Sequence, residues 1–562
     1  MQTVLKNLEG FYIINIDHSE SLFVYHKSRR SNDQEKTKDQ ENTKEQEKTT
    51  LRKLRREKAE SFFLIIRGAE VGVFAGLVCV LYRFLLSQAE SLLYRVIDFV
   101  KGSPVKCIIW IAALAILGAL VALIIKAVPD SGGSGIPQVT GEIKGYLSPS
   151  WWKVIIAKLV GSTASIFSGL ALGREGPSIQ FGAMAAKGVA KITKADKTTE
   201  LRMISCGAGA GLAAAFNAPL AGIVFVLEEI YKTFDKAILC MGIVAAVTAD
   251  FVSKLFFGQD TVFSYDSVTI PLRWYWLLII MGAVCGLFGV ISNILMIGFR
   301  DIVAKITKIP NTIKMAAGFA ISGAVGLLMP QILCGGHRMS ELLINEHPAI
   351  GAMAILLIAK FIFGIFSFGT GAPGGTLYPL CVLGAYLGAI YGTGAINIFG
   401  LDQSLWQEFV VLGMAGLFAS IVRAPITGVI LVFEITGNAS SLLPLVVVSL
   451  ISYALANMAG NTPFYAALLD RIVKHEGVKE SKAAEKVLES FIIPQNSPLC
   501  GKTISQIKWG KHCLIVSVER DETPITPKGD TELKAGDELI IMISQRHFAL
   551  DYARIERIIG GR

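Results

Sequence analysis

The sequence contains few charged residues and few of the residue patterns that form soluble catalytic or metal sites. Only 18% of its 562 residues are Asp, Glu, Lys or Arg, whereas 52% are hydrophobic. The nine cysteines are scattered and form no Cys-x-x-Cys pair, so we expect no metal site and no disulfide framework. Only seven histidines are present, and none stands within a long apolar run. The composition therefore excludes an ordinary soluble domain and favours a polytopic membrane protein.

Long runs of one charge sign are also missing. The net charge is +9, but much of the basic charge lies in residues 27–58, where Glu and Asp are interleaved with it. This pattern indicates a solvated tail and excludes a nucleic-acid surface. Residues 1–24 lack a continuous apolar region and a small-residue cleavage site, so we expect no signal peptide there. Residues 31–50 are almost wholly polar, and we expect residues 1–60 to be a largely disordered tail.

Apolar runs of membrane-spanning length make up much of the remaining chain. The runs at 107–125 and 442–458 are close to the roughly 20 residues that cross a bilayer. Several others are short or broken by Gly and Pro, which indicates re-entrant or discontinuous helices around a transport site. A basic cluster at 52–58 directly precedes the first apolar run, at Phe62. By the positive-inside rule we expect a multi-pass cell-membrane protein with both termini in the cytosol.

Residues 173–177, Gly-Arg-Glu-Gly-Pro, place a carboxylate and a guanidinium inside apolar sequence. Ionisable groups at membrane depth are costly to insert, so they usually mark an ion or proton path. The glycines allow backbone N–H groups to approach a ligand, and Pro177 suits the first turn of a helix. A helix that begins here would direct its unpaired N–H groups toward an anion. Two other deep cations, Lys360 and Arg423, are expected to be structural.

Residues 130–138, Asp-Ser-Gly-Gly-Ser-Gly-Ile-Pro-Gln, describe a second glycine-rich loop that leads into a short helix. Residues 132–135 also fit the Gly-x-Ser-Gly nucleophile loop of an intramembrane serine protease. Such a serine needs a histidine or lysine base within hydrogen-bond reach. His337 and His347 flank a polar loop, and the other five histidines lie near the two termini. We therefore expect this loop to bind an ion, and the protein not to be an enzyme.

Two of these loops, 133–137 and 173–177, closely resemble the first two signature loops of the CLC family of chloride channels and chloride/proton antiporters. The third signature of that family, a Gly-x-Phe-x-Pro loop, is similar to 375–379, where Leu377 replaces the usual Phe. Tyr465 stands where the family has its ion-binding tyrosine. The resemblance covers residues 61–474, and four motifs in the family's order are far more specific than any single motif.

The resemblance implies a chloride/proton antiporter that forms a homodimer, with one pore per subunit and no cofactor. Glu175 would be the gate, which occupies an anion site when ionised and carries a proton when neutral. Glu229 falls where the antiporters of the family, unlike the channels, keep an internal proton-transfer glutamate. Chloride would be bound by the hydroxyls of Ser134 and Tyr465 and the backbone N–H groups of Thr376 and Leu377, with Gly135, Arg174 and Gly176 completing the set.

An internal repeat supports an all-α membrane fold with two halves of inverted topology. Two segments recur, Ile-Phe-Ser at 166–168 and 365–367 and Ala-Pro-x-x-Gly at 218–222 and 424–428. Matching halves imply a transport site at their interface, near the bilayer midplane. Glu228 and Glu434 follow the Ala-Pro segments equivalently, so we expect them to accept hydrogen bonds from helix ends. Glu229 has Ile435 at its partner position, which makes it the better candidate for a directional task.

The end of the chain has the composition of a small soluble domain. Residues 475–488 are charged and read as a linker, and residues 489–562 as a cytosolic α+β domain. Strands are predicted at 514–518 and 539–543, with a turn at 534–537 before the second strand. The domain resembles the RCK-C (TrkA-C) regulatory domain of potassium-uptake and potassium-channel proteins. The resemblance implies a small-molecule or nucleotide ligand for this domain.

Two other functions stay open from the sequence. A passive chloride channel, gated by voltage or pH, would share the same loops and differ in whether chloride flux moves protons. A potassium transporter is suggested by the C-terminal domain alone. The sequence contains no Thr-Val-Gly-Tyr-Gly carbonyl filter, and N–H groups directed at an anion would repel a cation. We therefore expect chloride and protons as the transported ions.

Overall fold

We describe the protein from a computed structural model. The described residues are 31–232, 236–259, 268, 270–437, 441–475, 486–494, 497–510, 513–520, 523–544 and 548–560, and for 31–61 they comprise the backbone alone. The chain divides into two compact units, Met1–Leu64 and Ile65–Arg562, which are described separately.

The described part of the first unit is helical. Helix α1 (Ser31–Val100) begins in the region where the sequence predicts a largely disordered tail. The physical reason for the difference is propensity, because Lys, Glu and Gln are good helix formers and need no buried face to adopt the conformation. The remainder of the predicted tail, residues 1–30, and most of the predicted linker, residues 476–485, lie outside the described residues.

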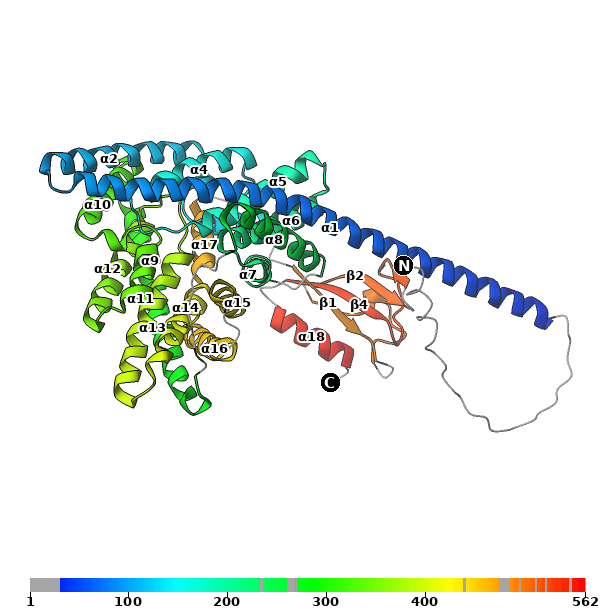
Figure 1. Cartoon of the computed structure of the whole chain (residues 1–562). Coiled ribbons are helices and arrows are strands. Elements are labelled where there is room, and N and C mark those ends of the chain that lie inside the picture. Colours follow the sequence, from blue (N-terminus) through cyan, green and yellow to red (C-terminus); the bar gives the residue numbers. More distant parts are fainter. Residues whose placement is uncertain are drawn as a thin grey trace, which may run out of the picture. The chain divides into compact units, whose positions relative to one another are not determined.

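The membrane part consists of two series of helices (Figure 1). The first series is α1, α2 (Pro104–Ala127), α3 (Ile136–Ile143), α4 (Trp151–Phe167), α5 (Glu175–Ile192), α6 (Lys197–Phe216), α7 (Pro219–Phe225), a π-helix (Val226–Tyr231) and α8 (Lys236–Phe257). The second series is α9 (Tyr275–Lys305), α10 (Asn311–Leu328), α11 (His337–Glu346), α12 (Ile350–Gly369), α13 (Leu377–Phe399), α14 (Trp406–Val422), α15 (Pro425–Thr436), α16 (Leu442–Met458) and α17 (Phe464–His475). Eight of the described helices are long and apolar enough to cross a membrane. This confirms the predicted all-α polytopic class.

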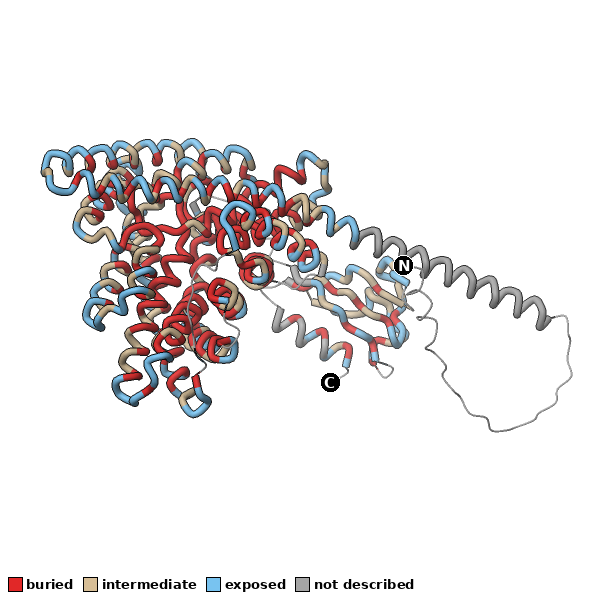
Figure 2. The backbone as a smooth tube through the Cα atoms, in the orientation of Figure 1, coloured by how far each residue is buried: buried red, intermediate tan, exposed pale blue. Residues whose placement is uncertain are grey.

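Small residues bring the central helices of each half into close contact. A Cβ on Gly182 of α5 would collide with the Gly207 carbonyl of α6, and a Cβ on Gly384 of α13 would collide with the Gly413 carbonyl of α14. Such contacts between backbones are how membrane helices pack, because lipid supplies no hydrophobic drive between them. Figure 2 shows α5 and α14 buried along most of their length, whereas α2 is largely exposed. The core therefore lies around α5, α6, α13 and α14.

The structure sets the register of the repeat through the two loops that meet at its centre. Gly173 and Gly375 pair as an antiparallel β-bridge. Helix α4 ends six residues before Gly173, and α12 ends six residues before Gly375. The Ile-Phe-Ser triplets at 166–168 and 365–367 are therefore out of register by a few residues, and equating them was wrong. Short apolar motifs recur easily in membrane helices, so the helix ends define the repeat better.

The C-terminal domain is a four-stranded antiparallel sheet with one helix. Its elements are β1 (Lys486–Ile492), β2 (Cys513–Arg520), β3 (Thr523–Ile525), β4 (Glu538–Ser544) and α18 (Phe548–Gly560), with the strand order β1-β4-β2-β3. The two predicted strands lie inside β2 and β4, which confirms the α+β prediction. Val518, Ile541 and Ile555 are fully buried in its core.

A salt bridge closes the turn before β4. Arg520 Nε donates to Asp537 Oδ1 at 2.8 Å, and the Lys534 backbone N–H donates to Asp537 Oδ2 at 2.8 Å. Burial alone would raise the pKa of Asp537, but these hydrogen bonds outweigh it and hold the pKa of the carboxyl below its usual range. The carboxylate is therefore ionised at neutral pH and orders the loop that joins β3 to β4.

Candidate functional site

Three glycine-rich loops from the two halves of the membrane part meet at one point. Gly173 and Gly375 exchange both backbone hydrogen bonds, each with an N···O distance of 2.7 Å. The Gly133 N–H donates to the Gly371 carbonyl at 3.1 Å, and the Gly374 N–H donates back to the Gly133 carbonyl at 3.2 Å. The loops before α3, α5 and α13 are thus tied to one another. Because these loops lead into helices, the starts of three helices lie close together, an arrangement suited to an anion.

The loop before α3 leaves no room for side chains at Gly135. This residue has a φ of +101°, which favours glycine. A Cβ here would lie 2.7 Å from Gln180 Oε1 and 3.0 Å from Lys158 Nζ. Lys158 Nζ also donates to the Gly133 carbonyl at 2.9 Å. The hydrogen bond from the buried Lys158 therefore holds the loop in one conformation.

Neutral donors surround the meeting point. Ser134 is buried, and its hydroxyl has no hydrogen-bond partner among the described residues. A Cβ on Gly176 would lie 2.5 Å from Ser134 Oγ and 3.1 Å from Gly375 Cα, so the second loop touches both the first and the third. Thr376 Oγ1 lies 3.3 Å from Tyr465 Oη, which connects α17 to the start of α13. The fold thus brings together most of the predicted chloride-binding residues.

Glu175 lies between the second and third loops. It is the first residue of α5, and its side chain is 1% exposed. Its Oε2 accepts a hydrogen bond from the Tyr378 backbone N–H at 3.3 Å and lies against Gly173 and Gly375. Its Oε1 has no hydrogen-bond partner among the described residues. The carboxylate therefore sits at the start of α13, beside fully buried Leu377, where an anion would be stabilised.

A cavity of about 380 Å³ reaches Glu175 from one side. Arg174, Tyr378 and His337 line it together with Glu175, whereas Ser134, Thr376 and Tyr465 do not. Arg174 therefore lies at this cavity, which the hydroxyl donors do not line. The role of Arg174 in chloride binding stays a prediction.

Glu229 lies elsewhere, in the π-helix that follows α7. Its side chain is 5% exposed, and its Oε2 is 3.8 Å from Lys232 Nζ. The neighbouring Glu228 points to the other half of the protein, where its carboxylate accepts hydrogen bonds from the backbone N–H groups of Ile426 at 3.2 Å and Thr427 at 2.7 Å. Two adjacent carboxylates thus have entirely different surroundings.

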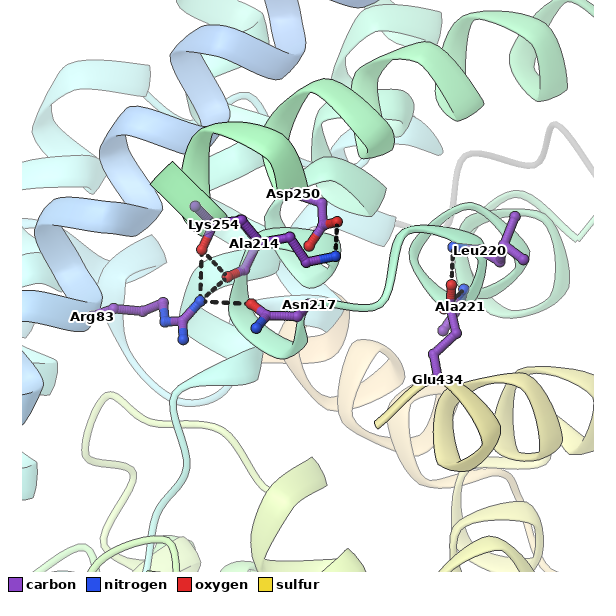
Figure 3. A network of polar contacts seen from close by, with 9 residues as sticks. Arg83, Ala214, Asn217, Leu220, Ala221, Asp250, Lys254 and Glu434 are labelled. Carbon is purple, nitrogen blue, oxygen red and sulfur yellow. Dashed lines mark hydrogen bonds and ion pairs between the residues drawn. The ribbon is translucent and has the colours of Figure 1, made fainter. Parts of the chain in front are cut away.

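Glu434 makes the reciprocal contact. Its carboxylate accepts hydrogen bonds from the backbone N–H groups of Leu220 at 3.0 Å and Ala221 at 2.7 Å, as Figure 3 shows. Each glutamate therefore caps the first turn of the short helix in the opposite half. The prediction that Glu228 and Glu434 accept hydrogen bonds from helix ends is confirmed.

Sequence analysis did not single out Lys158 or the contact between His337 and Tyr378. Lys158 and Lys360 each stand fifteen residues before the bridged glycines, and both donate to loop carbonyls. Lys360 Nζ donates to Cys334 O at 2.7 Å and to Ile332 O at 2.9 Å, which agrees with the structural role expected for it. The repeat offset could have revealed Lys158. His337 and Tyr378 carry no sequence signal of their contact, because they are 41 residues apart.

Metal coordination finds no support in the part of the chain that the structure describes. No group of three His, Cys, Asp or Glu side chains there could hold a metal ion. The described polar groups around the loops include hydroxyls, backbone N–H groups, the Lys158 ammonium and the Glu175 carboxylate, a set with several donors for an anion.

Family models match two parts of the chain. The one described as voltage gated chloride channel matches residues 117–457. The chain belongs to this family. The matched part of this CLC protein contains all three loops, while Tyr465 lies beyond it. A second model, described as the TrkA-C domain, matches residues 488–550.

Known relatives extend over most of the membrane part. The H(+)/Cl(-) exchange transporter ClcA of Vibrio campbellii is 34% identical over 439 residues, which are 76% of this chain and 93% of the relative. ClcA of Cronobacter sakazakii is 31% identical over 443 residues, 76% of this chain and 94% of the relative. Among solved structures, a slow cyanobacterial Cl-/H+ antiporter is similar with a TM-score of 0.71 and 26% identity, over 74% of this chain and 99% of that one. A eukaryotic CLC transporter, at 21% identity, has the same fold with a TM-score of 0.62, over 73% of this chain and 74% of that one.

Proposed function

We propose that this chain exchanges chloride for protons across a cell membrane. The relatives described as H(+)/Cl(-) exchange transporters, each covered over more than nine tenths of its length, support exchange over a passive channel. The buried Glu229 supports it too, because a channel needs no internal proton-transfer group. The observation that carries the proposal is the Glu175 carboxylate held at the start of α13 by the Tyr378 N–H.

The chloride site consists of Ser134 and Tyr465 hydroxyls and the backbone N–H groups of Thr376 and Leu377. Gly135 and Gly176 contribute backbone without a side chain of their own. All of these donors are neutral. Partial charges bind an anion firmly enough to replace its water, yet weakly enough to let it leave. Arg174 contributes from the cavity side, as a positive charge that draws anions toward the gate.

Glu175 links the two ions by competing with chloride. When ionised, its carboxylate fills the anion position at α13 and blocks the path. When it takes a proton from the cavity it becomes neutral, loses its attraction to the N–H groups and leaves the position to chloride. Glu229 receives or supplies the proton on the cytosolic side. Because Glu175 either occupies the anion position or carries a proton, chloride movement and proton movement exclude each other at this position.

The protein works as a homodimer in the membrane, with both termini in the cytosol and one pore in each subunit. Its parts are a tail (1–60), the membrane domain (61–474), a linker (475–488) and the TrkA-C domain (489–562). This last domain binds a negatively charged small molecule or nucleotide. A cavity of about 430 Å³ supports this, because Lys502, Lys508, Arg554 and Arg557 line it without a described carboxylate.

The test is a flux measurement in proteoliposomes that contain the purified full chain. A chloride gradient should drive protons in the opposite direction in the wild type. Glu175→Gln and Glu175→Ala should abolish proton movement while chloride flux persists, because a side chain that cannot exchange a proton cannot link the ions. Glu346→Gln, at the exposed end of α11, is the control and should keep both fluxes. Continued proton pumping by either Glu175 variant would contradict the gate assignment.

A further inference from the structure

Tyr378 is the residue through which the gate contacts α11. Its backbone N–H donates to Glu175 Oε2 at 3.3 Å, while its hydroxyl lies 2.9 Å from His337 Nδ1. The two rings also face each other, with centroids 4.5 Å apart. Phe216 of α6 also stacks on the Tyr378 ring, with the centroids 6.4 Å apart. The tyrosine ring thus contacts both α11 and α6, while its backbone holds the gate.

His337 is itself held in place independently of the tyrosine. Lys360 donates to Cys334 O at 2.7 Å, three residues before it. Gly336, with a φ of +103°, packs so closely that a Cβ would lie 3.2 Å from Val382 Cγ1 of α13. Two residues on, the Met339 carbonyl accepts a hydrogen bond from Tyr386 Oη of α13 at 2.9 Å. The imidazole therefore projects from a backbone that stays anchored if its own hydrogen bond is removed.

The surroundings of His337 favour a neutral imidazole ring. Arg83, Arg174, Arg338, Glu90 and Glu341 line the same cavity, and Lys360 donates to the Cys334 carbonyl three residues before His337. Burial, and after it the charges of Arg174, Lys360 and Arg83, oppose a positive charge on the imidazole. The neutral imidazole can form the hydrogen bond with the Tyr378 hydroxyl in either tautomer. Nδ1 is the acceptor in one tautomer and the donor in the other.

We propose that His337 is a positioning residue of the gate. By holding the Tyr378 hydroxyl it fixes the direction of the Tyr378 N–H, and so it sets how firmly the start of α13 retains the Glu175 carboxylate. This inference rests on the proposed gate role of Glu175. If the hydrogen bond between His337 and Tyr378 is lost, the ionised Glu175 carboxylate leaves its position without first taking a proton. Chloride then passes without counter-movement of a proton.

The test compares the ratio of chloride to proton flux in full-length variants. His337→Phe keeps an aromatic ring but removes the hydrogen bond, and Tyr378→Phe removes it from the other side. Each should raise the ratio by about two- to fivefold, the change expected for one weakened hydrogen bond. The double variant should exceed neither single one, because both remove the same contact. His337→Asn, whose amide reaches the position of Nδ1, should stay near the wild-type ratio.

A second set of measurements separates positioning from general damage. In the Glu175→Gln background, His337→Phe should leave chloride flux unchanged, because there is no carboxylate to retain. A changed flux there, additive effects in the double variant, or an unaltered ratio in His337→Phe would overturn the inference. If His337→Phe fails to fold, the comparison of Tyr378→Phe with His337→Asn decides. A wild-type protein that moves no protons would instead contradict the proposed exchange, before His337 is considered.

Discussion

Glu228 and Glu229 are neighbours in the chain, but the π-helix directs them to different surroundings. Glu228 oxygens accept hydrogen bonds from two backbone N–H groups and the Thr427 hydroxyl, the last at 2.7 Å. Glu229 is buried, with the Lys232 ammonium at 3.8 Å as a long ion pair. A carboxylate bound by fixed donors is anchored, whereas one with a single long ion pair can gain and lose a proton at lower cost.

This contrast predicts opposite results for two matched substitutions. Glu229→Gln should stop proton movement and leave chloride flux measurable, because the amide keeps size and polarity but cannot carry a proton. Glu228→Gln should keep at least part of the coupling and lose stability instead. Both fluxes are measured in the same vesicles, and thermal unfolding is measured in detergent. If Glu228→Gln uncouples the protein and Glu229→Gln does not, the repeat comparison has selected the wrong carboxylate.

At the scale of elements, the two halves stabilise each other's broken helices. Helices α7 and α15 begin after an Ala-Pro step and leave unpaired N–H groups in their first turns. Glu434 and Glu228 supply the acceptors from the opposite half. A short helix at membrane depth depends on such partners, because lipid offers no hydrogen bonds.

The exchange of caps predicts a cost for removing one of them. Glu434→Gln should lower the free energy of unfolding by about 1 kcal/mol, the usual contribution of a helix cap, because the amide bonds the Leu220 and Ala221 N–H groups less strongly than a carboxylate. The measurement is the midpoint of thermal unfolding in detergent. Glu346→Gln, at an exposed position, should leave the midpoint unchanged. A neutral result for Glu434→Gln would show that water satisfies the start of α7.

At the scale of the whole molecule, α17 follows the loops of the ion site in the sequence and precedes the soluble C-terminal domain. It carries Tyr465 near its start, and further along Arg471 binds Asp301 of α9 with two hydrogen bonds, of 2.6 and 2.7 Å. This salt bridge joins α9 to the helix that carries Tyr465. The TrkA-C domain follows after the linker and contributes a basic cavity of its own.

The basic cavity predicts anion binding by the full chain. Pyrophosphate, used as a simple probe, should raise the unfolding temperature of the TrkA-C domain, because a ligand that binds only the folded state stabilises it. Lys502→Glu combined with Arg557→Glu should abolish the shift. Lys528→Glu, an exposed charge change that does not line the cavity, should preserve it. Equal shifts in both variants would show that pyrophosphate acts elsewhere.

The local sequence was enough for the class of protein and for the chemistry of the loops. Apolar runs, glycine-rich turns and the prolines that start helices act within a few residues, so 130–138 and 173–177 were recognisable as loops leading into helices. The repeat of the Ala-Pro segments also predicted the capping glutamates correctly. For residues 31–60, however, the sequence pointed in two directions. The polar composition suggested disorder, whereas these residues have high helix propensity and form a helix in the structure.

Tertiary structure alone decided which of these loops meet and what lies between them. The hydrogen bonds between Gly173 and Gly375 join positions about two hundred residues apart, and the contact of His337 with Tyr378 depends on how α11 packs on α13. It also placed Arg174 at a cavity that Ser134 does not line. Sequence patterns report the conformation of a segment because the forces that set it are local. The partners of a segment depend on how all helices pack, and no stretch of the chain encodes that by itself.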